Sequence, residues 1–302
     1  MIWGQVKVWA RAIRLEQWTK NGVVMMAWLF SVADVTQKTL ERGALSFLAA
    51  VAMAFSFALV SSSFYLLNDV SDYDADRQHP VKRLRPIASR QIRRITAVRV
   101  ALVLFACGFL FPSLAVMLHP ELTIAFGTML AYTLMQCLYT GFLKKIPYVD
   151  VVTLATGFVL RAIAGAAIIK AYLSPWLIVC TFTLAMFLAF CKRKNEIDVA
   201  VGSREVLRHY HPRSLAACII LAGALSVGEY LVYTLTSAMG RRLPWLWVTT
   251  LFVLAGIVRY TWMTWHFKDV GRPERALLTD RILWWIFAGY GLTALFALFV
   301  RI

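Results

Sequence analysis

A run of oxygen-bearing side chains occupies residues 68–76, where the sequence reads NDVSDYDAD. If the preceding helix continues through this run, Asn68, Asp72 and Asp76 fall at positions i, i+4 and i+8 on one face, with Asp69 beside them. Carboxylates stacked along one stripe repel one another unless a cation lies between them. Amide and carboxylate oxygens with no His or Cys nearby suit Mg²⁺. We therefore predict a Mg²⁺ site with Asn68, Asp72 and Asp76 as ligands.

Basic side chains follow the aspartates directly, in the segment RQHPVKRLRPIASR. The positive-inside rule alone would explain such a loop at the end of a membrane span. Guanidinium groups also bind phosphate oxygens through paired hydrogen bonds, and Lys supplies a compact charge. Acid and base side by side fit one ligand, a phosphorylated substrate bridged to the protein by Mg²⁺. The residues that we expect to hold its phosphates are Arg77, Lys82, Arg83 and Arg85.

The composition is that of a membrane protein. Of 302 residues, 60% are hydrophobic and only 16% are charged, and the mean hydropathy is +0.66. A net charge of +16 could indicate a nucleic-acid partner, but the basic residues lie between apolar runs, so we expect none. The five cysteines form no CxxC pair, which argues against a disulfide framework or a zinc site.

Apolar runs of about 20 residues predict an all-α polytopic membrane protein with about nine transmembrane helices. The first run is the weakest, because Asp34 lies near its end. The expected spans are roughly 22–37, 44–67, 96–118, 121–141, 150–169, 174–191, 214–239, 243–266 and 282–300.

The distribution of Lys and Arg predicts the orientation. Placing the N-terminus inside leaves 23 basic residues in the inner segments and six in the outer ones, which is the bias expected for cytoplasmic loops. We expect one membrane domain over residues 1–302. It begins with an amphipathic helix on the membrane surface at 1–21, and its polar loops at 68–95 and 192–213 face the cytoplasm.

Other polar residues stand at the ends of spans or within them. Arg161 lies eleven residues after Asp150, roughly 16 Å deeper in the membrane at the rise of an α-helix. An arginine at that depth is functional by default, with a phosphate as a natural partner. Lys at a span end ordinarily snorkels to the surface, and Asp150 could simply cap its helix. The further candidates for substrate binding are Lys20, Asn21, Tyr148, Asp150, Lys192, Arg193 and Glu196.

These residues carry a resemblance to a known family. The run NDVSDYDAD resembles the NDxxDxxxD motif of the UbiA superfamily of intramembrane prenyltransferases. The extension DRQHPVKRLRPIA, with EQWTKN, YVDVVTLATGFVLRAIAG and KRKNE, is similar to the decaprenyl-phosphate phosphoribosyltransferase branch along nearly the whole chain. Ordinary members carry a second DxxxD motif, whereas the matching loop here reads CKRKNEIDVAVGSRE. This departure argues against an ordinary prenyl diphosphate substrate.

The resemblance implies a UbiA-like bundle with a cavity open to the cytoplasm and a lateral path for lipid, in a bacterial inner membrane. It implies Mg²⁺-dependent transfer from 5-phosphoribosyl 1-pyrophosphate (PRPP) to a polyprenyl phosphate, with pyrophosphate leaving, toward a lipid-linked arabinose donor. Membrane lipids are expected partners, and the sequence leaves self-association into a homo-oligomer open. The residues expected to act in catalysis are Asp69, Asp72, Asp76 and Arg161.

Two other functions fit the same sequence less well. An ordinary prenyltransferase would move a prenyl chain from a diphosphate to an aromatic acceptor, which the missing second motif and the added basic segment argue against. A transporter of anionic lipids would favour paired half-repeats and broken helices at the membrane midplane, which the sequence does not suggest.

Overall fold

The computed structural model describes residues 2–33, 44–79, 81–199, 205–267 and 279–299, and every regular element within these ranges is helical. Eight of the described helices are long and apolar enough to cross a membrane, which confirms the all-α, multi-pass prediction. The predicted span 22–37 corresponds to α2 (Val23–Ala33), and its remainder lies outside the described residues. The count of nine therefore stays a prediction.

The chain forms two compact units. Unit 1 contains residues 1–141 and 160–173, and unit 2 contains residues 142–159 and 174–302. Helix α7 (Val149–Ile168) begins in unit 2 and ends in unit 1. Each unit brings its own polar residues together, so the two are described separately.

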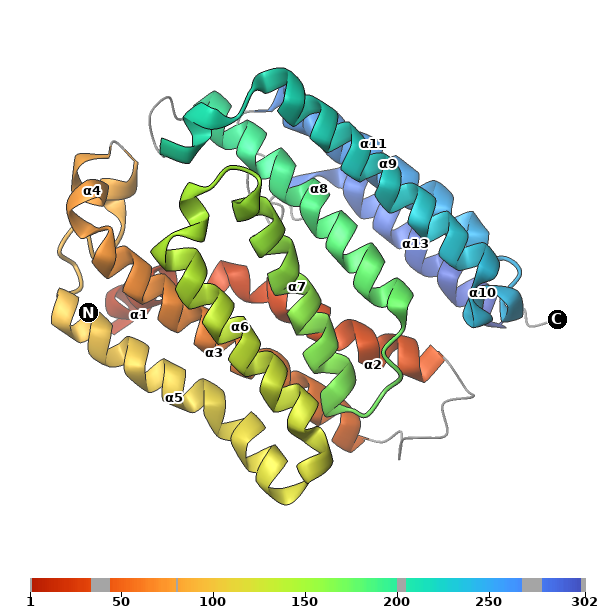
Figure 1. Ribbon diagram of the computed structural model, residues 1–302, viewed down its shortest axis with the longest axis horizontal. Helices are drawn as coiled ribbons and strands as arrows, with labels where there is room; N and C mark the ends of the chain where they lie inside the picture. Colours follow the sequence, from red (N-terminus) through yellow and green to blue (C-terminus); the bar gives the residue numbers. More distant parts are fainter. Residues whose placement is uncertain (1, 34–43, 80, 200–204, 268–278, 300–302) are drawn as a thin grey trace. The chain divides into compact units, whose positions relative to one another are not determined.

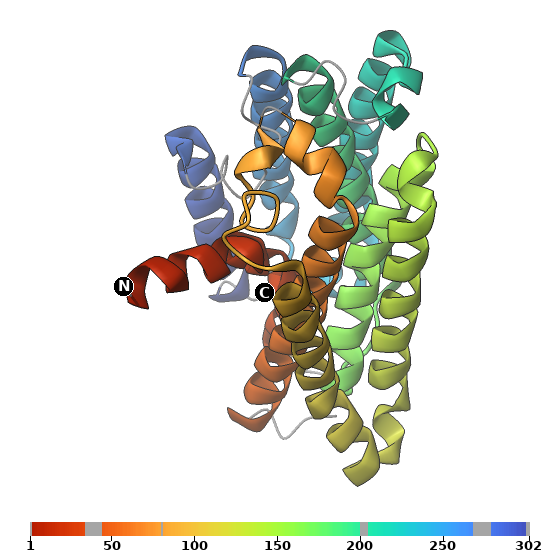
Figure 2. The same cartoon turned by 90° about the vertical axis from the view of Figure 1, so that its left-hand side faces the viewer.

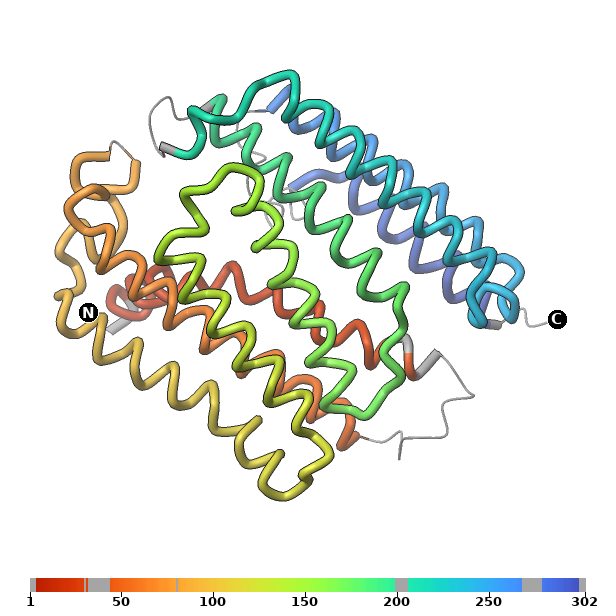
Figure 3. Tube along the Cα trace, in the orientation of Figure 1, coloured from red at the N-terminus to blue at the C-terminus, as the bar shows by residue number. Residues whose placement is uncertain are grey.

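Unit 1 is built around α3, which packs against α5 and α6 (Figure 1). Short helices follow α3, and Figure 3 traces the chain from α3 through them to the start of α5. The other elements of this unit before α7 are α1 (Ile2–Ala12), η1 (Leu15–Gly22), α2, α3 (Ala44–Ser71), α4 (Tyr73–Gln78), η2 (Lys82–Leu84), α5 (Arg94–Leu118), η3 (Pro120–Leu122) and α6 (Thr123–Gly141).

Close packing in unit 1 depends on two glycines. A Cβ atom added at Gly165 of α7 would lie 2.1 Å from the backbone oxygen of Val24 in α2. One added at Gly108 of α5 would lie 2.7 Å from Cγ2 of Val60 in α3. Membrane helices gain little from the hydrophobic effect on one another, and small residues at their contacts let van der Waals packing hold them together.

The N-terminal segment is divided. Helix α1 ends at Ala12, and Arg14, with φ 55°, lies in the left-handed region before η1 begins. Figure 2 shows α1 running across the direction of α3, as a helix lying on a membrane surface would. The residues predicted as one amphipathic helix over 1–21 thus form two elements.

Unit 2 contains the first turns of α7 and four long helices, in which α8 packs on α9, and α11 packs on α9 and α13 (Figure 1). Its largest apolar cluster includes Val151, Phe187, Leu215 and Ile219, all almost fully buried. The other elements of this unit are η4 (Leu143–Lys145), α8 (Pro175–Val199), η5 (Glu205–His209), α9 (Pro212–Thr236), α10 (Ala238–Arg242), η6 (Leu246–Val248), α11 (Thr249–His266) and α13 (Arg281–Phe299).

Helix α8 extends past the predicted end of its span. The polar residues that follow the span remain helical to Val199, so the segment 192–213 begins as two turns of helix. Ion pairs between Arg193 and Glu196 and between Lys194 and Asp198 join successive turns, and such pairs stabilise a helix. Charge alone therefore does not mark the end of this helix.

Candidate functional site

The helical spacing of Asn68, Asp72 and Asp76, the acidic stripe, continues past the end of α3. Asp72 joins α3 to α4, yet its backbone N–H donates to the carbonyl of Asn68 at 2.8 Å, and the N–H of Asp76 donates to the carbonyl of Asp72 at 2.8 Å. These bonds continue the i to i−4 pattern of a helix. Asn68, Asp72 and Asp76 therefore follow one another on successive turns, as the spacing predicts.

Two of the carboxylates are buried and joined by one arginine. Asp69 and Asp76 are 3% and 2% exposed. Nη1 of Arg85 donates to Oδ1 of Asp69 at 3.1 Å and to Oδ2 of Asp76 at 2.7 Å, and Nη2 of Arg14 donates to the same Asp69 oxygen at 2.7 Å. We call Asp69, Asp76, Arg14 and Arg85 the carboxylate–arginine cluster. It links the acidic stripe to the basic segment that follows it.

In this cluster the effect of burial on the pKa of Asp76 outweighs that of its arginine partner. Burial raises the pKa of the Asp76 carboxyl, and the adjacent Arg85 charge and hydrogen bond offset only part of that effect. The Asp69 carboxylate raises the pKa of Asp76 further, because it disfavours another negative charge nearby.

The donor set is compatible with Mg²⁺. Oδ1 of Asn68 is buried and has no hydrogen-bond partner among the described residues, and a buried amide oxygen without a partner is costly. Hard oxygen donors from one amide and carboxylates are what Mg²⁺ prefers. No group of three or more His, Cys, Asp or Glu side chains is gathered around one point in the described part of the chain. An ion held here would thus draw on the Asn68 amide oxygen and two carboxylates, those of Asp72 and Asp76.

The basic segment is more exposed than the carboxylates. Lys82 and Arg83 lie on the short helix η2, with Arg83 exposed and Lys82 half-buried. The preceding turn is shaped by His79, whose Nδ1 accepts the backbone N–H groups of Val81 at 3.1 Å and Lys82 at 3.2 Å. Burial lowers the pKa of this imidazole, which favours the neutral form that can accept these bonds. His79 therefore shapes the turn that leads into the segment.

A second polar group in unit 1 surrounds Arg161. This side chain is 6% exposed on α7. Its Nε donates to Oδ1 of Asn21 at 2.8 Å, and its Nη2 donates to the hydroxyls of Tyr132 at 2.8 Å and Ser61 at 3.2 Å. Its guanidinium also lies 4.6 Å from the ring centroid of Tyr132. The structure thus brings together Asn21 and Arg161, two candidates 140 residues apart, while neighbouring Lys20 contacts Gln17.

Unit 2 brings the other candidates together. Asp150 and Arg193 are both 0% exposed, and Nε of Arg193 lies 2.7 Å from Oδ2 of Asp150. Nη1 of Arg193 donates to Glu196, and the hydroxyl of Tyr210 donates to Oδ1 of Asp150. We call Asp150, Arg193, Glu196 and Tyr210 the buried arginine cluster. The charges of Asp150 and Arg193 are enclosed by the apolar core of unit 2, whereas the Glu196 side chain is 25% exposed.

Tyr148 and Tyr210 lie next to one another at the edge of this cluster. The backbone N–H of Tyr148, at φ 66°, donates to the Tyr210 hydroxyl at 2.8 Å, and the two ring centroids are 4.8 Å apart. Burial and the hydrogen bond to Asp150 raise the pKa of the Tyr210 phenol, so it stays protonated and donates. The remaining candidate, Lys192, is half-buried on α8.

The sequence did not single out four of the residues in these groups: Arg14, Ser61, Tyr132 and Tyr210. Arg14 contacts Asp69 across 55 residues of chain, and Tyr210 contacts Asp150 across 60. Tyr132 of α6 accepts a hydrogen bond from Arg161. The only sequence signal for it is a hydroxyl group within an apolar span. Pairings between distant segments leave no spacing signal in a single sequence.

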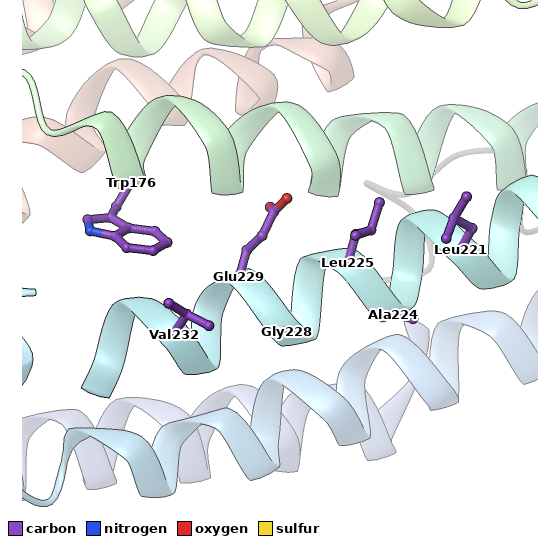
Figure 4. Close-up of a pocket in the computed structure, with 7 residues that line it drawn as sticks. All are labelled: Trp176, Leu221, Ala224, Leu225, Gly228, Glu229 and Val232. Carbon is purple, nitrogen blue, oxygen red and sulfur yellow. The ribbon is translucent and has the colours of Figure 1, made fainter. Parts of the chain in front are cut away.

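A pocket of about 450 Å³ between α8 and α9 of unit 2 has a different chemistry (Figure 4). Glu229 points from α9 toward α8, and its Oε2 accepts a hydrogen bond from Thr183 at 2.8 Å. The rest of the lining is apolar: Trp176, Leu221, Ala224, Leu225, Gly228 and Val232. Since none of these described lining residues is basic, the pocket does not suit a phosphate.

Comparison with known proteins agrees with this arrangement. The model of the UbiA prenyltransferase family matches residues 22–288. The chain is 32% identical over 283 residues to a decaprenyl-phosphate phosphoribosyltransferase of Mycobacterium tuberculosis strain H37Rv, which covers 90% of this chain and 88% of the relative. It is 30% identical over 281 residues to the protein of that name from Corynebacterium glutamicum, covering 90% and 81%.

Among solved structures, a UbiA homologue from Archaeoglobus fulgidus bound to DMAPP and Mg²⁺ has a similar fold. The TM-score is 0.70, with 17% sequence identity, over 97% of this chain and 99% of that one. This likeness supports the bundle of membrane helices described above.

Proposed function

Because this chain belongs to the UbiA prenyltransferase family, we propose that it is an enzyme that transfers a 5-phosphoribosyl group from PRPP to a polyprenyl phosphate and releases pyrophosphate. The names of its relatives support this reaction over an ordinary prenyl transfer. The observation that carries the proposal is Arg85 bridging Asp69 and Asp76, because it ties a phosphate-binding segment to a stripe of metal-binding oxygens.

The reaction needs two kinds of charge compensation. A phosphate oxygen of the lipid attacks C1 of the ribose, the bond from C1 to the pyrophosphate oxygen breaks, and its electron pair leaves with pyrophosphate. Positive charge develops on the ribose while negative charge develops on the leaving group, so positioning and electrostatics carry the catalysis. The attacking phosphate is already an anion, so no general base is required.

The carboxylate–arginine cluster and the polar residues beside it in the chain have distinct roles in this proposal. Asn68, Asp72 and Asp76 would hold Mg²⁺, which when bound neutralises charge on the pyrophosphate. Asp69 positions Arg85 and Arg14. Lys82 and Arg83, with Arg77, hold the 5-phosphate of PRPP through charge-assisted hydrogen bonds.

The remaining candidate residues receive substrate-binding roles, described for each unit separately. In unit 1, Arg161 with Asn21 and Lys20 would contact an anionic group of a substrate, since an arginine within the membrane needs a polar partner. In unit 2, Tyr148, Asp150, Lys192, Arg193 and Glu196 would serve substrate binding. The burial of Arg193 favours a role in positioning the others.

The location follows from the charge distribution. We place the N-terminus and the motif segments on the cytoplasmic side of a bacterial inner membrane, where soluble PRPP is present. The acceptor enters from the surrounding lipids. A product that carries a pentose phosphate on a polyprenyl phosphate suits the synthesis of a lipid-linked arabinose donor for the cell wall.

A labelled-substrate assay tests the proposal. Purified protein is incubated with Mg²⁺, PRPP labelled in the ribose, and decaprenyl phosphate, and lipids are extracted into organic solvent. We expect label in the lipid phase in proportion to pyrophosphate released, and none when EDTA is present. A parallel sample receives a prenyl diphosphate and an aromatic acceptor. Prenyl transfer there without label transfer from PRPP would replace the proposal with the ordinary reaction.

A further inference from the structure

Three arginines converge on Tyr73, the first residue of α4. The guanidinium carbons of Arg94 and Arg77 lie 4.6 Å and 5.7 Å from the centroid of its ring. Nε of Arg90 donates to its hydroxyl at 3.3 Å. We call Tyr73, Arg77, Arg90 and Arg94 the arginine–tyrosine patch. The segments that supply it come from both ends of the 68–95 region.

The patch concentrates positive charge without a matching acid. Among the described residues, no carboxylate oxygen lies within 4 Å of the guanidinium nitrogens of Arg77, Arg90 or Arg94. A tyrosine ring attracts cations only weakly, so it does not neutralise three of them. Like charges held together repel, and an anion bound among them would relieve that repulsion.

Arg90 has an unfavourable backbone conformation for a residue with a side chain. Its φ is 62°, in the left-handed region, where glycine or asparagine ordinarily stands. Nothing in the turn itself requires an arginine, because only its backbone N–H bonds there, to the carbonyl of Ile87 at 3.0 Å. Its side chain instead reaches Tyr73. A charged residue kept at a strained position points to a use for the charge.

The patch lies beside the ends of two candidate membrane spans. The span formed by α3 ends at Ser71, two residues before Tyr73, and the span formed by α5 begins at Arg94. The Tyr73 ring packs against the apolar cluster of Ala12 and Ile87, to which Trp9 of α1 also packs. In membrane proteins aromatic rings favour the depth of the lipid headgroups, and basic residues next to a span attract anionic lipids.

We propose that the arginine–tyrosine patch binds the phosphate of an anionic phospholipid headgroup at the membrane surface. The guanidinium forks and the phenol surround the phosphodiester, while the acyl chains extend along the spans. This lipid is a bound membrane component and not the acceptor of the proposed reaction. Arg77 is shared with the residues proposed to hold PRPP, so it is left unchanged in the test.

The test titrates the full-length protein in a neutral detergent with dioctanoyl phosphatidylglycerol and follows binding by native mass spectrometry. An arginine at an anionic surface contributes about fivefold in affinity, so the double variant Arg90→Gln/Arg94→Gln should bind about 30-fold more weakly. The matched control, Arg93→Gln/Arg99→Gln, removes the same charge from exposed neighbouring positions and should change binding by no more than about twofold.

The outcomes separate the sources of the anion. Equal losses in the two double variants, or equal binding of phosphatidylcholine by the wild type, would overturn the proposal. So would displacement of phosphatidylglycerol by inorganic phosphate or decaprenyl phosphate at matched concentrations, since the patch would then be a soluble-anion or acceptor site. If the double variant fails to fold, Arg94→Gln alone should weaken binding about fivefold. None of these measurements depends on enzymatic activity.

Discussion

Unit 1 and unit 2 each hold an arginine between two carboxylates, yet the two arrangements differ in burial. In the carboxylate–arginine cluster the Arg85 side chain is 29% exposed, so solvent and ligand can reach it. In the buried arginine cluster the Arg193 side chain is 0% exposed. A buried ion pair that loses one partner leaves an uncompensated charge, whereas a partly exposed one can exchange its partner for water or ligand. We therefore expect changes around Arg85 to affect reaction and changes at Arg193 to affect folding.

The largest expected effect is at Arg193. Replacement by Met leaves the buried Asp150 carboxylate without its cation and should destabilise the protein by about 3–5 kcal/mol. Thermal unfolding of the purified protein in detergent measures the loss. Lys194→Met removes a positive charge from the next residue, whose pair with Asp198 is partly exposed, and should cost no more than about 0.5 kcal/mol. Equal shifts for the two variants would contradict the distinction between the units.

Arg83 provides the opposite case in unit 1. Its side chain is exposed on η2, so Arg83→Gln should leave the unfolding temperature unchanged. The loss of a charge-assisted hydrogen bond to the 5-phosphate should lower kcat/KM for PRPP about 10- to 100-fold. The matched variant Arg93→Gln, also exposed, should retain its rate. A lower unfolding temperature with unchanged kinetics would remove Arg83 from the proposed site.

A smaller effect is expected inside unit 1, where a neutral hydroxyl supports Arg161. Tyr132→Phe removes a group that accepts from Arg161 at 2.8 Å and from Gln136 at 2.7 Å. Because the buried Arg161 and the half-buried Gln136 lose a hydrogen-bond partner, the variant should be less stable by about 1–2 kcal/mol. Tyr139→Phe, on the same helix, removes a hydroxyl with no hydrogen bond within the described residues. Its stability should be unchanged. A loss as large as that of Tyr132→Phe would show that the hydrogen bonds to the Tyr132 hydroxyl do not cause the loss in that variant.

The smallest predicted effect depends on pH and lies in unit 2. Nη2 of Arg259 bonds Asp280 at 2.6 Å, and this hydrogen bond lowers the pKa of the Asp280 carboxyl. A lowered folded-state pKa stabilises the protein above the unfolded pKa of aspartate, about 3.9, and that contribution is lost as the pH falls through the folded value. Asp280→Asn should therefore cost up to about 1 kcal/mol at pH 7, and this cost should shrink as the pH falls below about 3.9. A difference between the two proteins that stays constant as the pH falls below about 3.9 would contradict this assignment.

The sequence predicted most of what depends on local pattern. Apolar runs gave the described spans to within a few residues, apart from α8, where ion pairs within the helix carry it on to Val199. The spacing of Asn68, Asp72 and Asp76 gave their shared face. An arginine at membrane depth and an asparagine at a span end were both singled out, and they form a hydrogen bond.

What the sequence could not give depends on contacts between distant segments. Arg14 reads as one more basic residue of a surface helix until the fold places it on Asp69. Tyr210 lies in a polar segment with no motif of its own, yet it bonds Asp150. The contrast in burial between Arg85 and Arg193 is likewise absent from the sequence, because both follow apolar spans and both are flanked by charge.

The most direct test of the central claim compares two aspartates that are two residues apart. Asp72 lies on the stripe with Asn68 and Asp76, whereas Asp74 is exposed and lies off it. Transfer of the labelled phosphoribosyl group from PRPP to decaprenyl phosphate is measured for Asp72→Asn and Asp74→Asn. The unfolding temperature of each variant is measured first, to confirm that both are folded. We expect a loss of about 10²–10³-fold for Asp72→Asn and a change within about twofold for Asp74→Asn. Equal rates for the two variants would show that the stripe is not the reaction centre.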